Sequence, residues 1–194
     1  MARKETIDKV TAILWREESV LVIRDSSGLL SLPQVTGAKP EKLLEAFLPL
    51  TEIMPLIEEK DPVFVYEEEE RFYRHHPFVA SLPLNFNETE NRVLLSYDDF
   101  EKADLDPATR VLLGHYFYFL PIALKRPREI PLEEEEQAKA EKMLNLLARQ
   151  KKALPKKELA AFRALIEAPS SPTRIRKAFY YLGERYHLHL GGWL

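Results

Sequence analysis

The sequence predicts an α+β fold, with a mixed sheet and packed helices over residues 1–126 and a small basic helical module over residues 127–194. Three observations lead to this prediction. Strand-like apolar stretches predominate up to residue 96, whereas apolar residues recur at helical spacing from residue 107 onward. Residues 125–131 (KRPREIP) combine two prolines with alternating charge, as extended linkers do. The net charge is −11 over residues 1–141 and +8 over residues 142–194.

Strands are expected where short apolar stretches lie between turn signals. Residues 7–15 carry apolar side chains on both faces, which indicates a central strand. Asp25 to Gly28 predict a turn, because Gly takes positive φ freely and Asp bonds locally to the backbone. The expected strands cover residues 7–15, 20–23, 29–32, 63–67, 72–82 and 92–96.

Two segments of the first domain are expected to be irregular. Pro33, Gly37 and Pro40 should break regular structure over residues 33–40, and residues 58–62 should form a polar connector.

Helices are expected where apolar residues recur at three- and four-residue spacing. Asp106 is a suitable N-cap and Pro107 suits the first helical position. Ser171 and Pro172 repeat that arrangement before the last helix. The expected helices cover residues 41–54, 97–100, 107–120, 133–152, 155–167 and 172–186.

The order of strand, turn, strand, irregular loop and helix around Leu32-Pro33 resembles the Nudix family. In that family a strand ending in Leu-Pro-Gly-Gly feeds a loop and a helix whose carboxylates hold a divalent metal against a diphosphate. The resemblance covers residues 5–125, and Leu32-Pro33 and Glu52 match the family pattern. Other positions depart from it: Gln34 and Val35 replace the glycines, Pro40 replaces a glutamate, Leu48 and Pro49 replace an Arg-Glu pair, and Ile53 replaces a second glutamate.

The resemblance therefore implies a degenerate Nudix box. Magnesium prefers an octahedron of oxygen ligands, which Glu52 alone does not supply, and Pro49 would kink or end the helix. We expect ordinary Nudix hydrolysis to be weak or absent. If the chain is active, Glu52, Glu41 and Glu45 are the catalytic candidates. The metal candidates, for Mg or Mn, are Glu52, Glu68 and Glu69.

A retained ligand pocket is the main functional expectation, with a nucleotide or nucleoside-diphosphate derivative as the ligand. The candidate ligand-binding residues are Gln34, His75, His76 and Tyr116. Adjacent residues of a strand point to opposite faces, so His75 and His76 are not expected to bind one metal together.

The basic C-terminal helices predict a helix-turn-helix-like module that binds DNA or RNA. The candidate contacts are Lys156, Lys157, Thr173, Arg174 and Lys177. The alternative is that these helices dock on the acidic body of their own chain.

Several classes of function are unsupported. There is no cysteine, no Gly-x-x-x-x-Gly-Lys loop and no Gly-x-Ser-x-Gly motif. No apolar run reaches the roughly 18 residues that span a membrane, so we expect a cytoplasmic protein. Three functions stay open: a binding module without hydrolysis, a divergent metal-dependent pyrophosphohydrolase, and a structural subunit of an assembly. A homodimer is also left open.

Overall fold

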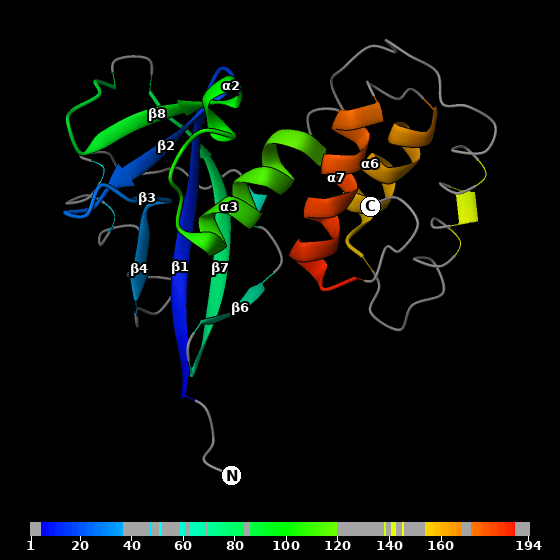
Figure 1. Ribbon diagram of the computed structural model, residues 1–194, viewed down its shortest axis with the longest axis horizontal. Helices are drawn as coiled ribbons and strands as arrows, with labels where there is room; N and C mark the ends of the chain where they lie inside the picture. The colour runs from blue at the N-terminus through cyan, green and yellow to red at the C-terminus, as the bar shows by residue number, and fades with distance from the viewer. Residues whose placement is uncertain are drawn as a thin grey trace. The chain divides into compact units, whose positions relative to one another are not determined.

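The computed structural model describes most of the predicted sheet and the two last helices (Figure 1). The described residues are 5–36, 47, 51, 59–60, 63–68, 70–83, 86–119, 138, 141–142, 145, 154–167 and 172–188, without the side chains of 59–60, 119, 162, 165–167 and 172–176. The chain divides into two units, Met1–Thr109 and Arg110–Leu194. The predicted boundary between residues 126 and 127 lies outside the described residues and stays a prediction.

The longest strand, β1 (Glu5–Arg16), is the centre of the sheet, as its two apolar faces predicted. It pairs in parallel with β7 (Arg71–Ser81), from Glu5 opposite Arg71 to Trp15 opposite Ser81. Its other edge pairs antiparallel with β2 (Ser19–Arg24) and β4 (Gln34–Thr36). Parallel and antiparallel pairing on one strand makes the sheet mixed, which confirms the predicted α+β class.

Shorter strands extend the sheet on both sides. β2 also pairs with β3 (Leu30–Ser31) and β8 (Arg92–Ser96), and β7 pairs with β5 (Glu59–Lys60) and β6 (Phe64–Glu68). The turn at Gly28 has a φ of +91°, and the Asp25 carboxylate accepts hydrogen bonds from the backbone N–H groups of Ser27 and Leu29. The expected turn is therefore confirmed with its expected chemistry.

Two segments predicted to be irregular are strands instead. Gln34–Thr36 pairs with β1 although Pro33 precedes it, because Pro33 lacks only an N–H and its carbonyl still accepts a hydrogen bond from the N–H of Ala12 at 2.9 Å. Glu59 and Lys60, expected in a polar connector, pair with Val79 and Phe78. Both strands are too short to show a period in the sequence.

The helices of the first unit begin where the sequence predicted. α2 (Tyr97–Phe100) is capped by Ser96, whose hydroxyl accepts a hydrogen bond from the N–H of Asp99. α3 (Pro107–Gly114) begins after Asp106, whose carboxylate accepts a hydrogen bond from the N–H of Thr109 at 2.8 Å. Thr109 in turn accepts a hydrogen bond from the N–H of Leu32, which ties the first turn of α3 to the chain after β3.

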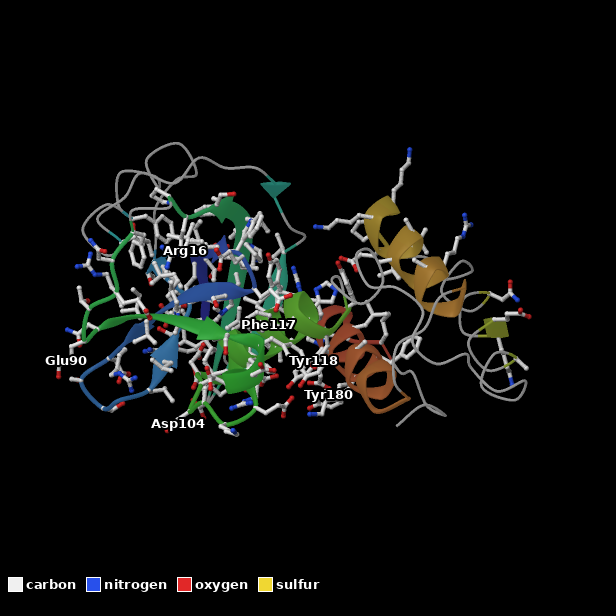
Figure 2. All side chains as sticks on the ribbon, turned by 90° about the horizontal axis from the view of Figure 1, so that it is seen from above. Arg16, Glu90, Asp104, Phe117, Tyr118 and Tyr180 are labelled. Carbon is white, nitrogen blue, oxygen red and sulfur yellow. The ribbon has the colours of Figure 1, made fainter. Side chains whose placement is uncertain are left out.

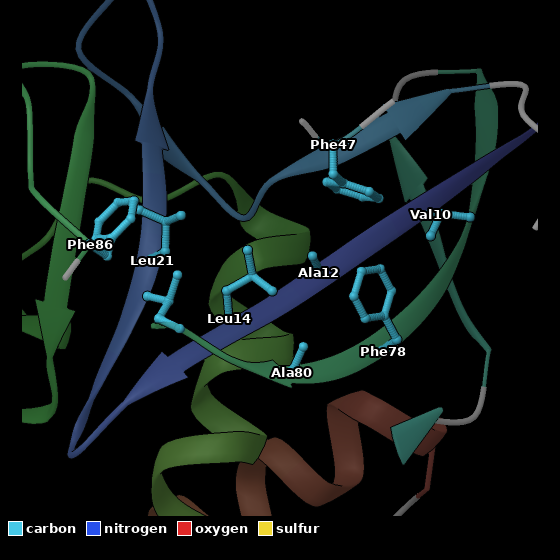
Figure 3. Packing of buried hydrophobic residues seen from close by; sticks show 9 residues of the cluster. Val10, Ala12, Leu14, Leu21, Phe47, Phe78, Ala80 and Phe86 are labelled. Atoms are coloured by element: carbon cyan, nitrogen blue, oxygen red, sulfur yellow. The ribbon is translucent and has the colours of Figure 1, made fainter. Parts of the chain in front are cut away.

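One face of the sheet carries an apolar core that includes a helical residue from the Nudix-like segment (Figure 3). Phe47 is fully buried and packs edge-on against Phe78, with ring centroids 5.4 Å apart. Phe47 and Thr51 are helical, in agreement with the predicted helix, and the rest of residues 41–54 lies outside the described residues. The core cluster on this face comprises Val10, Ala12, Leu14, Leu21, Phe47, Phe78, Ala80, Leu82 and Phe86.

The second unit is built from helices in its described part. α3 runs on into a π-helical turn, η2 (His115–Phe119), and α6 (Lys156–Glu167) and α7 (Pro172–Tyr186) begin at the residues expected from Pro155 and Pro172. Of the expected helix over residues 133–152, Ala138, Glu141, Lys142 and Asn145 are described, and all four are helical. In the described part of the chain, no helix has the length and apolar character needed to cross a membrane.

Close packing between α3 and α7 depends on a glycine. A Cβ placed on Gly114 would overlap the ring of Tyr181. That ring also stacks on Tyr118, with centroids 5.7 Å apart. Tyr181 therefore occupies space that any side chain at position 114 would need.

We expect Gly114→Ala to lower the free energy of unfolding by about 2 kcal/mol, because overpacking against Tyr181 outweighs the gain in helix propensity of about 1 kcal/mol. Chemical denaturation measures this loss. The double variant Gly114→Ala/Tyr181→Ala removes the overlap. The losses of unfolding free energy in the two single variants should therefore sum to more than the loss in the double variant. Strict additivity would contradict the packing explanation.

Candidate functional site

The pairing of β1 with β7 assigns the two adjacent histidines to opposite faces of the sheet. His76 pairs with Val10 and lies on the face of Phe78 and the apolar core, which we call the His76 face. His75 pairs with Lys9 and lies on the other face, the His75 face. The expectation that the two rings point apart is confirmed.

His75 belongs to a buried polar pair. Its side chain is 3% exposed, and its Nδ1 lies 3.0 Å from the hydroxyl of Thr11, which is equally buried. Its ring also lies 6.1 Å from that of Phe64. Gln34 pairs with Thr11 in the sheet, so Gln34 and His75, two predicted ligand residues, lie on the same face, on strands that flank β1. The burial of His75 favours a positioning role for its ring.

His76 is the accessible histidine. Its side chain is 41% exposed and its Nε2 lies 2.8 Å from Oδ1 of Asp8. The same Asp8 oxygen is 3.4 Å from Nη1 of Arg74, which is also half-exposed. Asp8 thus holds an imidazole and a guanidinium side by side at the open end of the His76 face. We call Asp8, Arg74 and His76 the Asp8 cluster.

A similar ion pair lies on the opposite face of the same strands. Nε of Arg71 is 3.4 Å from Oε2 of Glu5, and both side chains are more than half exposed. In the described structure this pair has no histidine beside it. It lies on the same strands as the Asp8 cluster and has the same distance between arginine nitrogen and carboxylate oxygen.

The Asp8 cluster has the donors of an anion site. A guanidinium presents five N–H groups in a planar fork, and Asp8 contacts Arg74 through one nitrogen. A carboxylate bonded to one ring nitrogen of a histidine fixes the orientation of the ring. The Arg74 guanidinium can therefore hold a phosphate-like group, with the His76 ring beside it.

The predicted metal and catalytic residues are described only in part. Glu41, Glu45, Glu52 and Glu69 lie outside the described residues. Glu68 is exposed at the end of β6, where it pairs with Arg71. Across the described residues, no group of three or more His, Asp or Glu side chains is placed to hold a metal ion.

Tyr116, the remaining ligand candidate, belongs to the helical unit. It is half-buried on η2 and its ring lies 5.8 Å from that of Phe117, at a steep angle. It is therefore part of the aromatic packing of that unit.

The predicted nucleic-acid contacts fall into three groups. Lys156 is exposed and Lys157 half-exposed at the start of α6. Lys177 is half-buried, donates a hydrogen bond to the hydroxyl of Tyr118 at 3.3 Å and lies 5.2 Å from the centre of that ring. The side chains of Thr173 and Arg174 lie outside the description. Tyr118 and the exposed Tyr180 are labelled in Figure 2.

A buried polar cluster in the helical unit was not predicted. Glu158 on α6 is 1% exposed, and its two oxygens lie 3.1 Å from Nε2 of His115 and 3.1 Å from the hydroxyl of Tyr186. The guanidinium of Arg185 lies 5.3 Å from the centre of the Tyr186 ring. One carboxylate therefore joins η2, α6 and α7. The signal in the sequence was Glu158 itself, a lone acid on the apolar side of α6.

The environment of Glu158 acts on its pKa in two directions. Burial by itself raises the pKa of this carboxyl, but the hydrogen bond and the charge of His115, followed by the Tyr186 hydroxyl and the charge of Lys157, outweigh burial. The pKa of Glu158 therefore lies below its ordinary value of 4.5. Ionised Glu158 is the form that the cluster stabilises.

Nudix hydrolases are among the solved structures that this chain resembles, as the sequence resemblance predicted. No protein-family model matches the sequence, and no curated protein is significantly similar to it. The E. coli ORF135 protein is 20% identical, with 64% of this chain and 96% of that chain covered and a TM-score of 0.48. A NUDIX hydrolase from Nitrosomonas europaea is 14% identical, with 58% and 88% covered and a TM-score of 0.47. The MutT protein from Methanosarcina mazei Go1 is 16% identical, with 56% and 90% covered and a TM-score of 0.46.

We expect the stability of the helical unit to depend on pH through Glu158. Its folded pKa lies below its unfolded pKa, so its contribution is present above the unfolded pKa and is lost as the pH falls through the folded pKa. Glu158→Gln should lower the free energy of unfolding by about 3 kcal/mol at pH 7 and flatten its decline below pH 4.5. Glu184→Gln, which removes an exposed carboxylate from α7, is the control. Equal acid sensitivity in the wild type and Glu158→Gln would contradict the role of the cluster.

Proposed function

We propose that the first domain is a Nudix-like module that binds a nucleotide or a nucleoside-diphosphate derivative and has lost ordinary hydrolysis. The observation that carries this proposal is the Asp8 cluster, an accessible pairing of Arg74 with His76 on the sheet face that also holds Phe47. A guanidinium binds phosphate oxygens through parallel hydrogen bonds, and charge-assisted bonds of this kind are about twice as strong as neutral ones.

The loss of hydrolysis is supported by what the chain does after Leu32-Pro33. The Nudix pattern has two glycines there. Here Gln34 and Val35 stay in the sheet, and Val35 pairs with Val10 and packs against the apolar core. The strand thus continues through the positions of the two glycines, and Pro49 and Ile53 replace further residues of the box.

We expect Arg74→Ala to weaken the binding of ADP about tenfold, because it removes the donors to the phosphates. We expect His76→Ala to weaken it as well, because the His76 ring and Arg74 share the same Asp8 oxygen. Isothermal titration calorimetry measures the dissociation constant. Arg71→Ala is the matched control, since Arg71 lies on the same strand in an ion pair of the same length on the opposite face. It should leave the affinity unchanged.

Two outcomes would favour the other functions left open by the sequence. Turnover of ADP or ADP-ribose with Mg or Mn that is abolished by Glu52→Gln would replace the binding module by a divergent pyrophosphohydrolase. If the wild type binds neither compound, a structural subunit becomes the better account.

We propose nucleic-acid binding by the helical module as a second function, and the exposed face of α6 supports it. Lys156 and Arg163 are both exposed and lie seven residues apart, with exposed Ala160 between them. Residues at this spacing share one side of a helix, so the two cations are two turns apart in line. Lys177 donates a hydrogen bond to the hydroxyl of Tyr118. The cations that we propose to contact phosphates are therefore those of α6.

We expect Lys156→Ala/Arg163→Ala to lower the affinity for a duplex DNA of about 20 base pairs, because two phosphate contacts are lost. The slope of log affinity against log salt should fall by about two units, as fluorescence anisotropy at several salt concentrations would show. Lys102→Ala, an exposed lysine of the first unit, is the control. Unchanged DNA affinity with a lower melting temperature would favour a module that docks on its own acidic body.

A further inference from the structure

Two of the three exposed large apolar side chains among the described residues lie beside the Asp8 cluster. Val65, on the edge strand β6, is 38% exposed, and Val63, which directly precedes β6, is 47% exposed. Tyr180, at 44%, is the third such residue and belongs to the helical unit. Edge strands of soluble proteins more often carry charged residues at such positions. The two exposed valines at this edge of the sheet are therefore a candidate binding surface.

The pairing of β6 with β7 puts Val65 on the His76 face. Val65 pairs with Arg74, and the next residue back, Phe64, pairs with His75. Phe64 is buried at 2% exposure on the His75 face. Because successive residues of a strand alternate, Val65 lies on the face of Arg74 and His76, and Val63 directly precedes the strand, two residues before Val65.

The dimensions of the site favour a small ligand over a protein partner. Residues two apart on a strand are separated by about 6.7 Å, and adjacent strands by about 4.8 Å. Two valines at this spacing present an apolar surface about the length of one planar heterocycle. A stable protein interface buries about 800 Å² on each partner, far more than two valine side chains offer.

We propose that Val63 and Val65 are the surface on which the base of the bound nucleotide lies, while its phosphates contact Arg74 and His76. This assignment rests on the proposed function of the first domain. The base is then the part of the ligand that makes the site prefer nucleotides over inorganic phosphates. Both parts of the site are on one face, one strand apart, so one ligand can reach both.

The Arg74 guanidinium is the cation of the site. It contacts Asp8 through Nη1, and a guanidinium carries five N–H groups in all. An apolar ring beside them excludes water from the guanidinium and strengthens its bond to a phosphate. The valines contribute area without any hydrogen-bonding group, so they do not select one base over another.

The test compares two probes, ADP and inorganic pyrophosphate, by calorimetry on the full chain. Val63→Thr/Val65→Thr keeps the β-branched shape that suits a strand and replaces one methyl group of each valine by a hydroxyl. We expect this variant to bind ADP roughly tenfold more weakly and pyrophosphate as well as the wild type does. Tyr180→Ser, which removes the exposed apolar side chain of the helical unit, should change neither affinity.

The outcomes separate this inference from the proposed function. If Arg74→Ala weakens both probes while the threonine variant binds ADP normally, phosphate binding stands and the valine surface is wrong. If the threonine variant loses affinity for pyrophosphate as well, the change has disturbed the sheet and the assignment of the base fails. If Arg74→Ala affects neither probe, the proposed function falls and this inference falls with it.

Discussion

The parallel pairing of β1 with β7 is the constraint on which the rest of the first unit depends. It joins residues more than sixty positions apart, such as Thr11 and His75, along the full length of β7. A shift of one residue in this pairing would exchange the two faces of β7. His76 would then face Thr11 in the buried layer and Phe78 would leave Phe47, so the core and the candidate site are specified by one register.

What the sequence could predict follows from the range of the interactions involved. Local signals were sufficient for the turn at Gly28, the N-cap at Asp106 and the opposite faces of His75 and His76, since each depends on residues close in the chain. The short strands β4 and β5 were missed because their pairing comes from long-range partners. The Asp8 cluster is of the same kind, since Asp8 meets Arg74 and His76 only after β1 and β7 pair in a known register.

The helical unit shows the same dependence on a distant partner in a different form. Glu158 alone on the apolar side of α6 would be costly, because an ionised carboxylate loses its hydration on burial. His115 and Tyr186, which lie 43 and 28 residues away, satisfy its two oxygens and hold η2 and α7 against α6. Apolar packing alone permits helices to slide over one another, whereas a buried carboxylate with two partners is satisfied in one arrangement only. We infer that this cluster defines how the three segments fit, in addition to its expected contribution to their stability.

The proposed binding module also explains how the Nudix-like box can lack most of its carboxylates while the sheet carries the Asp8 cluster. A diphosphate bound through magnesium needs several oxygens at one point, and in this chain Glu52 is the one box carboxylate that matches the family pattern. A diphosphate bound by a guanidinium needs no metal, because Arg74 is itself a cation and Asp8 holds it in place. On the proposed function, the diphosphate is held by the Arg74 guanidinium of the Asp8 cluster and not by metal-bound box carboxylates.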